Sequence, residues 1–285
     1  MQTVDSSKKL QLLLEARRRH KLKIGFVPTM GALHAGHLSL IRTAKRQNDF
    51  VVVSIFVNPL QFGPKEDFKH YPRTLKADAR ACARAGADLV FHPYAETLFR
   101  DNPPVIERAT ALAKPLCGRF RPGHFRGVLT IVALLLRLVK PHRLYLGLKD
   151  YQQYLVIREL VKRRFSGKIE VVGCPTVREK DGLAMSSRNV YLTAAERKTA
   201  LQLSQTLQMG AEFIENRLFD PLTVQKLMQK RLQKNGISKI DYVEIVDART
   251  LRKVVKSKPP AASGSILLAA AVHIGKTRLI DNFLV

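Results

Sequence analysis

The sequence predicts an α/β protein in which a Rossmann-like, doubly wound parallel sheet is followed by a smaller C-terminal α+β domain. Short apolar, β-branched runs alternate with helical stretches as far as Val172, which is typical of a parallel sheet covered by helices. Segments rich in polar residues and glycine follow these runs, at the strand ends where such sheets bind ligands. We therefore expect a first domain over residues 1–176 and a second over residues 177–285.

The strands of the first domain are predicted from runs rich in Val, Ile, Leu and Phe. They cover Ile24–Val27, Phe50–Val57, Leu89–Phe91, Arg143–Leu146 and Ile169–Val172. Helices are predicted between them over Gly36–Gln47, Leu75–Ala85, Gly127–Val139 and Tyr151–Phe165. Right-handed crossovers between successive strands then place helices on both faces of the sheet.

The second domain begins with longer helical patterns. Helices are predicted over Ala194–Asn216 and Leu222–Asn235, and Gly236 ends the second one. Strands are predicted over Asp241–Ala248 and Ile266–His273, separated by a loop over Lys256–Ser265 that contains Lys, Pro, Ser and Gly. This order of elements indicates a small α+β domain.

Charge is the feature that most favours a nucleic-acid partner. The 285 residues include 49 Lys and Arg against 23 Asp and Glu, which gives a formal net charge of +26, and such a charge attracts polyanions. The basic residues are dispersed, however, and the sequence has no RNP motif, zinc finger or basic tail. We expect no specific nucleic-acid partner, but a basic nucleic-acid-binding protein stays open as an alternative from another functional class.

No segment has the length of apolar residues that a membrane span requires, since Arg137 interrupts the longest candidate, Val128–Val139. The amino terminus does not read as a signal peptide, and we expect no membrane partner. Cys82, Cys117 and Cys174 are odd in number and far apart, so they predict neither a disulfide framework nor a CxxC metal site. We expect a cytoplasmic protein.

The segment PTMGALHAGHLSLI, Pro28–Ile41, places His34 and His37 three residues apart where a strand turns into a helix. Side chains at this spacing share one helix face. The first helical turn also presents unpaired N–H groups and a partial positive charge, which favour phosphate. Gly31 and Gly36 would let a ligand approach the main chain closely. The alternative is a pair of ordinary polar surface histidines.

A second segment, DGLAMSSRN, follows the last predicted strand of the first domain and contains Ser186, Ser187 and Arg188 in sequence. Two hydroxyls and a guanidinium supply directional donors for phosphate oxygens. By itself the segment is equally compatible with a helix N-cap and a solvated Arg. Together with the earlier histidines, it resembles the HIGH and KMSKS motifs of the adenylate-forming nucleotidylyltransferase superfamily.

The chain more closely resembles the pantothenate synthetase (pantoate–β-alanine ligase) family, and the resemblance runs nearly end to end. The segments that carry it are VPTMGALHAGHLSLI, SIFVNPLQFGPKEDFKHYPRT, CGRFRPGHFRGV, GLKDYQQY, REKDGLAMSSRN and GKTRLIDN. The resemblance implies ATP-dependent activation of pantoate as pantoyl adenylate, and then attack by β-alanine to give pantothenate and AMP. It also implies Mg²⁺ and a homodimer.

The resemblance assigns roles to matching residues of this sequence. Catalytic roles fall on His34, His37, Lys149 and Arg188, with His37 as the proton donor. The ATP-binding residues it implies are Met30, Gly31, Ala32, Leu33, His34, Ala35, Gly36, His37, Gly147, Leu148, Lys149, Asp150, Val177, Met185, Ser186, Ser187 and Arg188. Without the family resemblance, Val177 would be interpreted as an ordinary aliphatic residue in a loop.

The two glutamines and two aspartates complete the predicted site. The family pattern assigns Gln61 and Gln153 to pantoate and Gln61 also to β-alanine, and amides can orient a carboxylate and hydroxyls without acting as nucleophiles. Gln153 alone would read as a helix-surface residue. Asp78 and Asp150 are candidate Mg²⁺ ligands, although a salt bridge with a lysine is a competing interpretation for Asp78.

Some positions depart from the family pattern. Leu148 stands where Glu is usual, and Leu134 stands where Lys is common. Arg121 and His124 either line the pocket or belong to a structural turn, and Asn58 either caps a turn or contacts the adenylate. A nucleotidylyltransferase with another acceptor, such as a phosphopantetheine or nicotinate nucleotide, is the nearest alternative enzyme.

Overall fold

The computed structural model describes residues 1–64, 66–254 and 265–285. The chain forms two compact units. Unit 1 comprises Met1–Ala113, Arg121–Leu148 and Gln153–Pro175, and unit 2 comprises Lys114–Phe120, Lys149–Gln152 and Thr176–Val285. The two short segments of unit 2, Lys114–Phe120 and Lys149–Gln152, were not predicted from the sequence. The domain boundary at 176/177 stays a prediction. The predicted loop Lys256–Ser265 lies outside the described residues, except for Ser265.

Unit 1 is built on a parallel sheet with the strand order β1-β4-β3-β2-β5-β6. The strands are β1 (Gln2–Val4), β2 (Ile24–Thr29), β3 (Phe50–Ile55), β4 (Leu89–Phe91), β5 (Arg143–Gly147) and β6 (Glu170–Cys174). The predicted parallel sheet is confirmed. From β2 the chain proceeds through β3 to β4, which lies next to the edge strand β1, and then returns to place β5 on the other side of β2, so the strand order reverses at this pair. Ligands of open α/β sheets lie at such a switch point.

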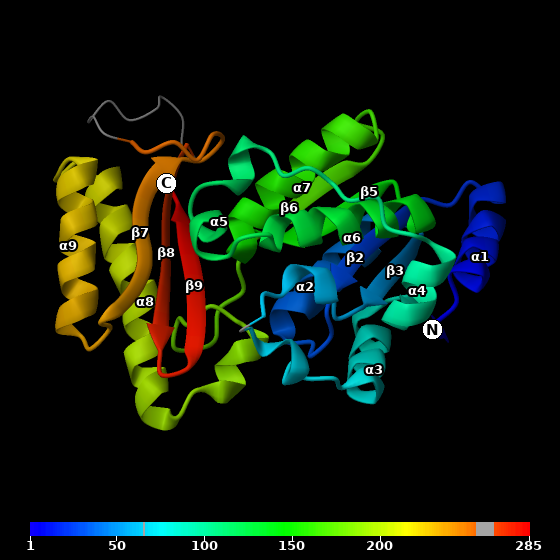
Figure 1. The fold of residues 1–285 in the computed structure, drawn as a ribbon, viewed down its shortest axis with the longest axis horizontal. Helices are drawn as coiled ribbons and strands as arrows, with labels where there is room; N and C mark the ends of the chain where they lie inside the picture. Colours follow the sequence, from blue (N-terminus) through cyan, green and yellow to red (C-terminus); the bar gives the residue numbers. More distant parts are fainter. Residues whose placement is uncertain (65, 255–264) are drawn as a thin grey trace. The chain divides into compact units, whose positions relative to one another are not determined.

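The helices of unit 1 flank this sheet (Figure 1). They are α1 (Ser7–Arg19), α2 (Ala35–Gln47), α3 (Leu75–Ala85), α4 (Ala95–Asp101), α6 (His124–Val139) and α7 (Tyr151–Arg164), whose first residues Tyr151 and Gln152 belong to unit 2. Short 3₁₀ turns lie at η1 (Pro59–Gln61), η2 (Asp67–Lys69), η3 (Ala111–Ala113) and η4 (Leu148–Asp150). Helix α6 begins earlier than the predicted Gly127, and α1 and α4 were not predicted.

One hydrophobic core of unit 1 lies between the sheet and helices α2 and α3. Ile41 of α2 and Cys82 of α3 pack with Val27 and Val53 of the central strands, all without measurable exposure. Burial of these side chains fixes the start of α2 against the end of β2, because both elements contribute to the same cluster. The corner that contains His34 and His37 is therefore attached to a packed core.

Unit 2 contains an antiparallel sheet in the order β7-β8-β9. Its strands are β7 (Lys239–Asp247), β8 (Ile266–Ile274) and β9 (Thr277–Leu284), and its helices are α5 (Cys117–Phe120), α8 (Ala194–Glu215) and α9 (Pro221–Lys234), with the 3₁₀ turn η5 (Ser187–Tyr191). Helices α8 and α9 cover one face of the sheet (Figure 1). The predicted α+β character is confirmed, although β9 was not predicted.

Candidate active site

The first candidate segment forms the corner between β2 and α2. His34 is the N-cap residue of α2 in an extended conformation, and its backbone N–H donates to Nδ1 of His37 at 3.4 Å. The two rings lie with their centroids 4.1 Å apart. Because Nδ1 of His37 accepts this hydrogen bond, the proton of the neutral ring is on Nε2. The His37 ring can therefore donate from Nε2 at the first turn of α2.

Asp78 holds the loop that precedes this corner. Its side chain is buried, at 3% exposure of the residue, and accepts hydrogen bonds from the N–H groups of Ala32 at 3.0 Å and Leu33 at 2.8 Å. The Thr74 hydroxyl donates to the same carboxylate at 3.1 Å. Gly31 has φ +84° and Ala32 has φ +49°, so the loop needs such an anchor to keep an uncommon conformation.

These contacts bear on whether Asp78 suits a Mg²⁺ ion. Oδ2 accepts from Ala32 and Thr74, so both of its lone pairs are engaged by donors. Oδ1 accepts from Leu33. The donor set fits a loop anchor better than it fits a direct Mg²⁺ ligand, which normally offers an oxygen to the ion.

The end of β5 lies at the switch point of unit 1, next to β2. Gly147 is the last residue of β5, and Leu148 follows it. A Cβ atom at Gly173 of β6 would lie 2.7 Å from Cδ2 of Leu148, so Leu148 packs closely over the neighbouring strand. Leu134, the other departure from the family pattern, is buried in α6 at 3% exposure. Both leucines thus make apolar contacts suited to their surroundings.

Gln61 lies in a hydrogen-bonded network with the first segment. Its side-chain amide donates to Sδ of Met30 at 3.0 Å, and its Oε1 accepts from Nδ2 of Asn58 at 3.0 Å. Asn58 is 1% exposed, caps η1 by accepting from the Leu60 N–H, and also donates to the carbonyl of Gly127 at 3.2 Å. Gln61 and Met30, both predicted site residues, are therefore in direct contact.

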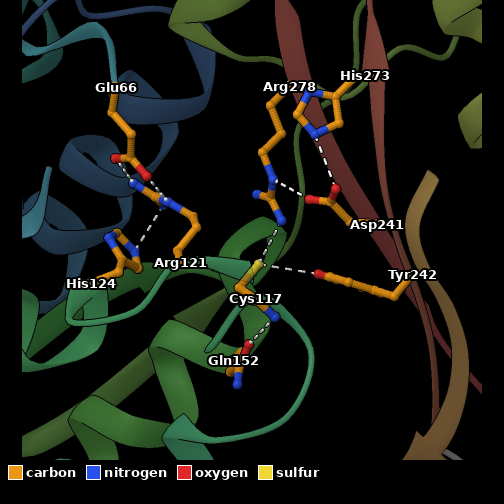
Figure 2. Close-up of polar contacts among 9 residues, drawn as sticks. All are labelled: Glu66, Cys117, Arg121, His124, Gln152, Asp241, Tyr242, His273 and Arg278. Carbon is orange, nitrogen blue, oxygen red and sulfur yellow. Dashed lines mark hydrogen bonds and ion pairs between the residues drawn. The ribbon is translucent and has the colours of Figure 1, made fainter. Parts of the chain in front are cut away.

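Glu66, Arg121 and His124 form a cluster (Figure 2) that contacts the main chain at Gln61. Nδ1 of His124 lies 2.9 Å from the Gln61 carbonyl, and Nε2 lies 3.1 Å from a guanidinium nitrogen of Arg121. Because a carbonyl only accepts and a guanidinium only donates, Nδ1 of His124 donates to the Gln61 carbonyl and Nε2 accepts from Arg121. Arg121 and His124 thus have structural contacts beside the site.

Arg121 in turn makes a two-pronged ion pair with Glu66, at 2.7 and 2.6 Å (Figure 2). Burial by itself raises the pKa of the Glu66 carboxyl, but the hydrogen bonds and charge of Arg121 outweigh it, and the pKa lies below its ordinary value. Glu66 is consequently ionised at neutral pH and keeps Arg121 oriented toward His124.

Gly127 is where α6 approaches the Gln61 turn, since a Cβ atom there would lie 1.9 Å from the carbonyl oxygen of Leu60. We predict that Gly127→Ala forces the turn and helix apart. The expected result is a loss of about 1–3 kcal/mol in the free energy of unfolding, the usual cost of overpacking, together with a higher KM for whichever substrate Gln61 binds. Denaturant unfolding and steady-state kinetics would measure both.

Gly63→Ala is the matched control, because a Cβ atom at Gly63 would have its nearest neighbour, in Glu66, at 3.8 Å. We expect it to leave stability and KM close to those of the unmodified protein. Equal behaviour of the two alanine variants would contradict the structural role given to Gly127.

In unit 2, Lys149 and Asp150 stand at the start of α7. Nζ of Lys149 lies 3.4 Å from the Asp150 carboxylate, and the Lys149 and Asp150 side chains are 20% and 46% exposed. Gln152 anchors this helix start, because its Oε1 accepts from the N–H of Cys117 at 3.1 Å (Figure 2). Asp150 offers an accessible carboxylate beside a cation, a donor set that fits a hydrated Mg²⁺ ion carried by phosphates.

The residues before the Ser-Ser-Arg segment form a short hairpin. The N–H of Met185 donates to the carbonyl of Val177 at 3.0 Å, and the N–H of Glu179 donates to that of Leu183 at 2.8 Å. Gly182 turns the chain with φ +93°, a conformation that favours glycine. Val177 and Met185, two predicted ATP-binding residues, are therefore brought together by main-chain pairing.

The Ser-Ser-Arg segment itself begins the 3₁₀ turn η5. Ser186 is its N-cap residue, and the Ser186 hydroxyl accepts from the N–H of Arg188 at 3.2 Å. Asn189 donates to Glu179 at 2.7 Å, and Glu179 also pairs with Arg197 of α8 at 2.7 Å. The helix-cap interpretation of the segment is thus realised, and the hairpin and η5 are tied to α8.

The predicted residues are divided between the two units. Unit 1 contains the Met30–His37 corner, Gln61, Asp78, Gly147, Leu148 and Gln153, and unit 2 contains Lys149, Asp150, Val177 and Met185–Arg188. No role was predicted for Glu66, which pairs with Arg121, or for Arg178, Asp281 and Asn282, which contact the segments of unit 2. These residues lie in three segments that carry the family resemblance, SIFVNPLQFGPKEDFKHYPRT, REKDGLAMSSRN and GKTRLIDN.

Within residues 1–64, 66–254 and 265–285, no helix has the length and apolar character needed to cross a membrane. The same part of the chain contains no group of three or more His, Cys, Asp or Glu side chains arranged to hold a metal ion.

Known proteins resemble this chain over its whole length. The family model described as pantoate-beta-alanine ligase matches residues 2–284. The pantothenate synthetase of Thermotoga neapolitana is 48% identical over 282 residues, covering 99% of this chain and 99% of that protein.

Two crystal structures give the same result. Pantothenate synthetase from Thermus thermophilus superposes with a TM-score of 0.90 at 41% identity, covering 100% of this chain and 99% of the other. Pantoate-beta-alanine ligase from Francisella tularensis, complexed with beta-gamma ATP and beta-alanine, superposes with a TM-score of 0.81 at 37% identity, covering 100% and 97%. The chain therefore belongs to the pantoate–β-alanine ligase family.

Proposed function

We propose that the protein joins (R)-pantoate to β-alanine at the expense of ATP, forming pantothenate, AMP and pyrophosphate through a pantoyl adenylate. The observation that carries the proposal is the β2–α2 corner, where His34 and His37 stand at the first turn of a helix beside a sheet switch point. Such a corner suits phosphate. Family membership adds the acid and the amine that the reaction uses.

In the first step the pantoate carboxylate attacks the α-phosphorus of ATP, and the bond to the bridging oxygen of pyrophosphate breaks. Negative charge develops on the departing pyrophosphate, so fixed donors and cations lower the barrier. His37 donates from Nε2, because its Nδ1 is occupied by the His34 N–H. We assign His34, Lys149, Ser186, Ser187 and Arg188 to the same phosphate chain.

The main chain binds the nucleotide. We assign this role to Met30–His37, to Gly147–Asp150, and to Val177 and Met185. The anchoring of the first of these segments by Asp78 supports the assignment, since a loop held before the ligand arrives loses less entropy on binding.

In the second step the β-alanine amine attacks the acyl carbonyl, AMP leaves with the carboxylate oxygen that it gained, and the amine loses a proton. Gln61 and Gln153 orient pantoate, and Gln61 also contacts β-alanine. The hydrogen bond from the Gln61 amide to Met30 of the first segment supports this assignment. An amide at this point orients the acid without competing for the acyl group.

ATP enters as its Mg²⁺ complex, for which the accessible Asp150 carboxylate is the better of the two predicted ligands. The ion supplies positive charge to the phosphates when bound. We also propose a cytoplasmic homodimer, on the strength of family membership.

The proposal is tested by incubating the purified protein with pantoate, β-alanine and MgATP and omitting each substrate in turn. Pantothenate and AMP should appear in equal amounts, and only when all three substrates are present. Formation of ADP in place of AMP would exclude the adenylate route. Transfer of AMP to a phosphopantetheine or nicotinate nucleotide would identify a different acceptor, and nucleic-acid binding that persists at physiological salt would favour the basic binding protein.

A further inference from the structure

The C-terminal strand β9 presents Asp281 and Asn282 next to each other. Successive side chains of a strand point to opposite faces, so these two side chains contact different parts of the structure. Leu279 and Phe283, which lie on the same face of β9 as Asp281, pack in the core of unit 2 beneath α8. Asn282 is on the other face, together with Arg278.

Asn282 holds the start of α7. Its side-chain amide donates to the main-chain carbonyl of Lys149 at 2.7 Å. Four residues earlier on the same face of β9, Arg278 lies 3.6 Å from Sγ of Cys117, and the Cys117 N–H donates to Gln152 (Figure 2). The segment Lys149–Gln152 is thus fastened to β9 at both ends.

The Arg278 end of this attachment is itself fixed by an ion-pair network. Nε of Arg278 donates to Asp241 of β7 at 2.8 Å, and His273 of β8 contacts the same carboxylate at 3.0 Å (Figure 2). The Tyr242 hydroxyl lies 3.1 Å from Sγ of Cys117 (Figure 2). Side chains of β7 therefore contact both Arg278 and Cys117, and the main-chain N–H of Cys117 binds Gln152.

Asp281 holds the other segment. Its carboxylate accepts from both terminal nitrogens of Arg178, at 2.7 and 3.1 Å, and the Arg178 guanidinium lies over the Phe283 ring at 4.5 Å. Arg178 pairs with Ala184 across the hairpin that leads to Met185 and donates to the Gly182 carbonyl at 3.1 Å. The Asp281 side chain is 2% exposed, so the pair has little competition from water.

We propose that Asp281 and Asn282 are positioning residues that hold two separate ATP-binding segments, one on each face of β9. Asn282 fixes the position of the main chain at Lys149. Asp281 fixes the position of the hairpin that leads to Met185–Arg188. This inference rests on the proposed function, because it takes those segments as the ones that bind the ATP phosphates. It gives the GKTRLIDN segment a physical role: a rigid strand that keeps the two segments in a fixed relation before ATP arrives.

The test replaces Asn282 by Asp, which keeps the size of the side chain but puts a carboxylate against the Lys149 carbonyl. We expect the Kd for MgATP, measured by calorimetry, to rise about tenfold or more. kcat/KM for ATP should fall by about 10- to 100-fold, the scale for a misplaced binding group. KM for β-alanine should stay within about twofold, because Gln61 is held by contacts within unit 1.

Asn235→Asp is the matched control, since Asn235 also donates its amide to a main-chain carbonyl of unit 2, that of Arg231 at 2.8 Å, at the end of α9. It should bind MgATP as the unmodified protein does. Asn282→Ala removes the donor without adding charge, and it carries the test if the Asp variant does not fold. Asp281→Asn should weaken ATP binding as well and also lower the Tm, because it breaks a buried ion pair.

The outcomes separate this inference from the function. If the unmodified protein makes pantothenate but both Asn282 variants bind MgATP normally, the positioning role is refuted and the function stands. A uniform loss for ATP and β-alanine that follows a lower Tm would also refute it. If the unmodified protein makes no pantothenate, the proposed function fails, and the binding measurements still decide whether Asn282 controls the nucleotide site.

Discussion

Replacing His37 by Ala should lower pantoate-dependent exchange of pyrophosphate into ATP by about 10²-fold or more, the scale for losing one preorganised donor to developing charge. The ring is held in place by the His34 N–H on Nδ1 and by contact with the His34 ring. The donor on Nε2 is therefore oriented before ATP binds. Because His37 stands on the first turn of α2 rather than in the core, we expect the Tm to change little.

Two further variants sharpen this prediction. His37→Gln keeps an N–H donor and should recover part of the exchange rate, whereas a role in proton transfer would not be recovered by an amide. His20→Ala serves as the control, since His20 is an exposed residue at the end of α1. Exchange at the unmodified rate in His37→Ala would remove this residue from the mechanism.

Replacing Asp78 by Asn should be nearly as damaging, for a different reason. Asp78 accepts from the Ala32 and Leu33 N–H groups and from the Thr74 hydroxyl. An amide has a single acceptor atom, so its NH₂ group must then face a donor. We expect the free energy of unfolding to fall by about 2–4 kcal/mol, because a buried donor is left unsatisfied, and kcat/KM for ATP to fall by roughly 10²-fold as the loop shifts.

The two roles considered for Asp78 give different results in the absence of metal. A loop anchor predicts that Asp78→Asn lowers the Tm equally in EDTA and in Mg²⁺, without ATP present. A Mg²⁺ ligand predicts an unchanged Tm in EDTA and a greater Mg²⁺ requirement for activity. Asp88→Asn is a useful control, since Asp88 is a carboxylate of the same unit that also accepts from a main-chain N–H, that of Val51 at 2.8 Å.

The elements that could be predicted from the sequence are those in which buried residues form a continuous run or recur at a regular spacing. Runs such as Phe50–Ile55 are almost wholly buried, and a continuous apolar run is what a central parallel strand requires. Strand β1 has only one buried residue, Val4, so it shows no apolar run, whereas the equally short β4 is buried throughout. Helix α1 buries only Leu10 and Leu14 completely among many charged residues, so its sequence resembles a solvated segment.

Strand β9 was missed for a related reason. Its sequence TRLIDNFL mixes charged and apolar residues, and its polar side chains are partnered by residues far away in the chain. Asp281 pairs with Arg178, and Asn282 contacts Lys149. Such partners cannot be read from local spacing, because they depend on how the segments pack.

The same distinction holds for the site. The HxGH corner could be predicted because its chemistry lies in four consecutive residues at a strand-to-helix turn. The role of Asp78 could not, since a carboxylate in a helix is equally compatible with a metal ligand, a salt bridge or a loop anchor, and the loop amides that engage it are 45 and 46 residues earlier in the chain. Motif spacing indicates which groups act, and packing determines what holds them.

The central claim is that the pantoate carboxylate becomes bonded to the α-phosphorus of ATP before the amide forms. The most direct measurement uses pantoate labelled with ¹⁸O in its carboxylate and follows the label by mass spectrometry during pantothenate synthesis. We predict that one labelled oxygen appears in AMP for each pantothenate made, because AMP leaves with the oxygen that attacked phosphorus. AMP without label, or label found in inorganic phosphate together with ADP, would contradict the account.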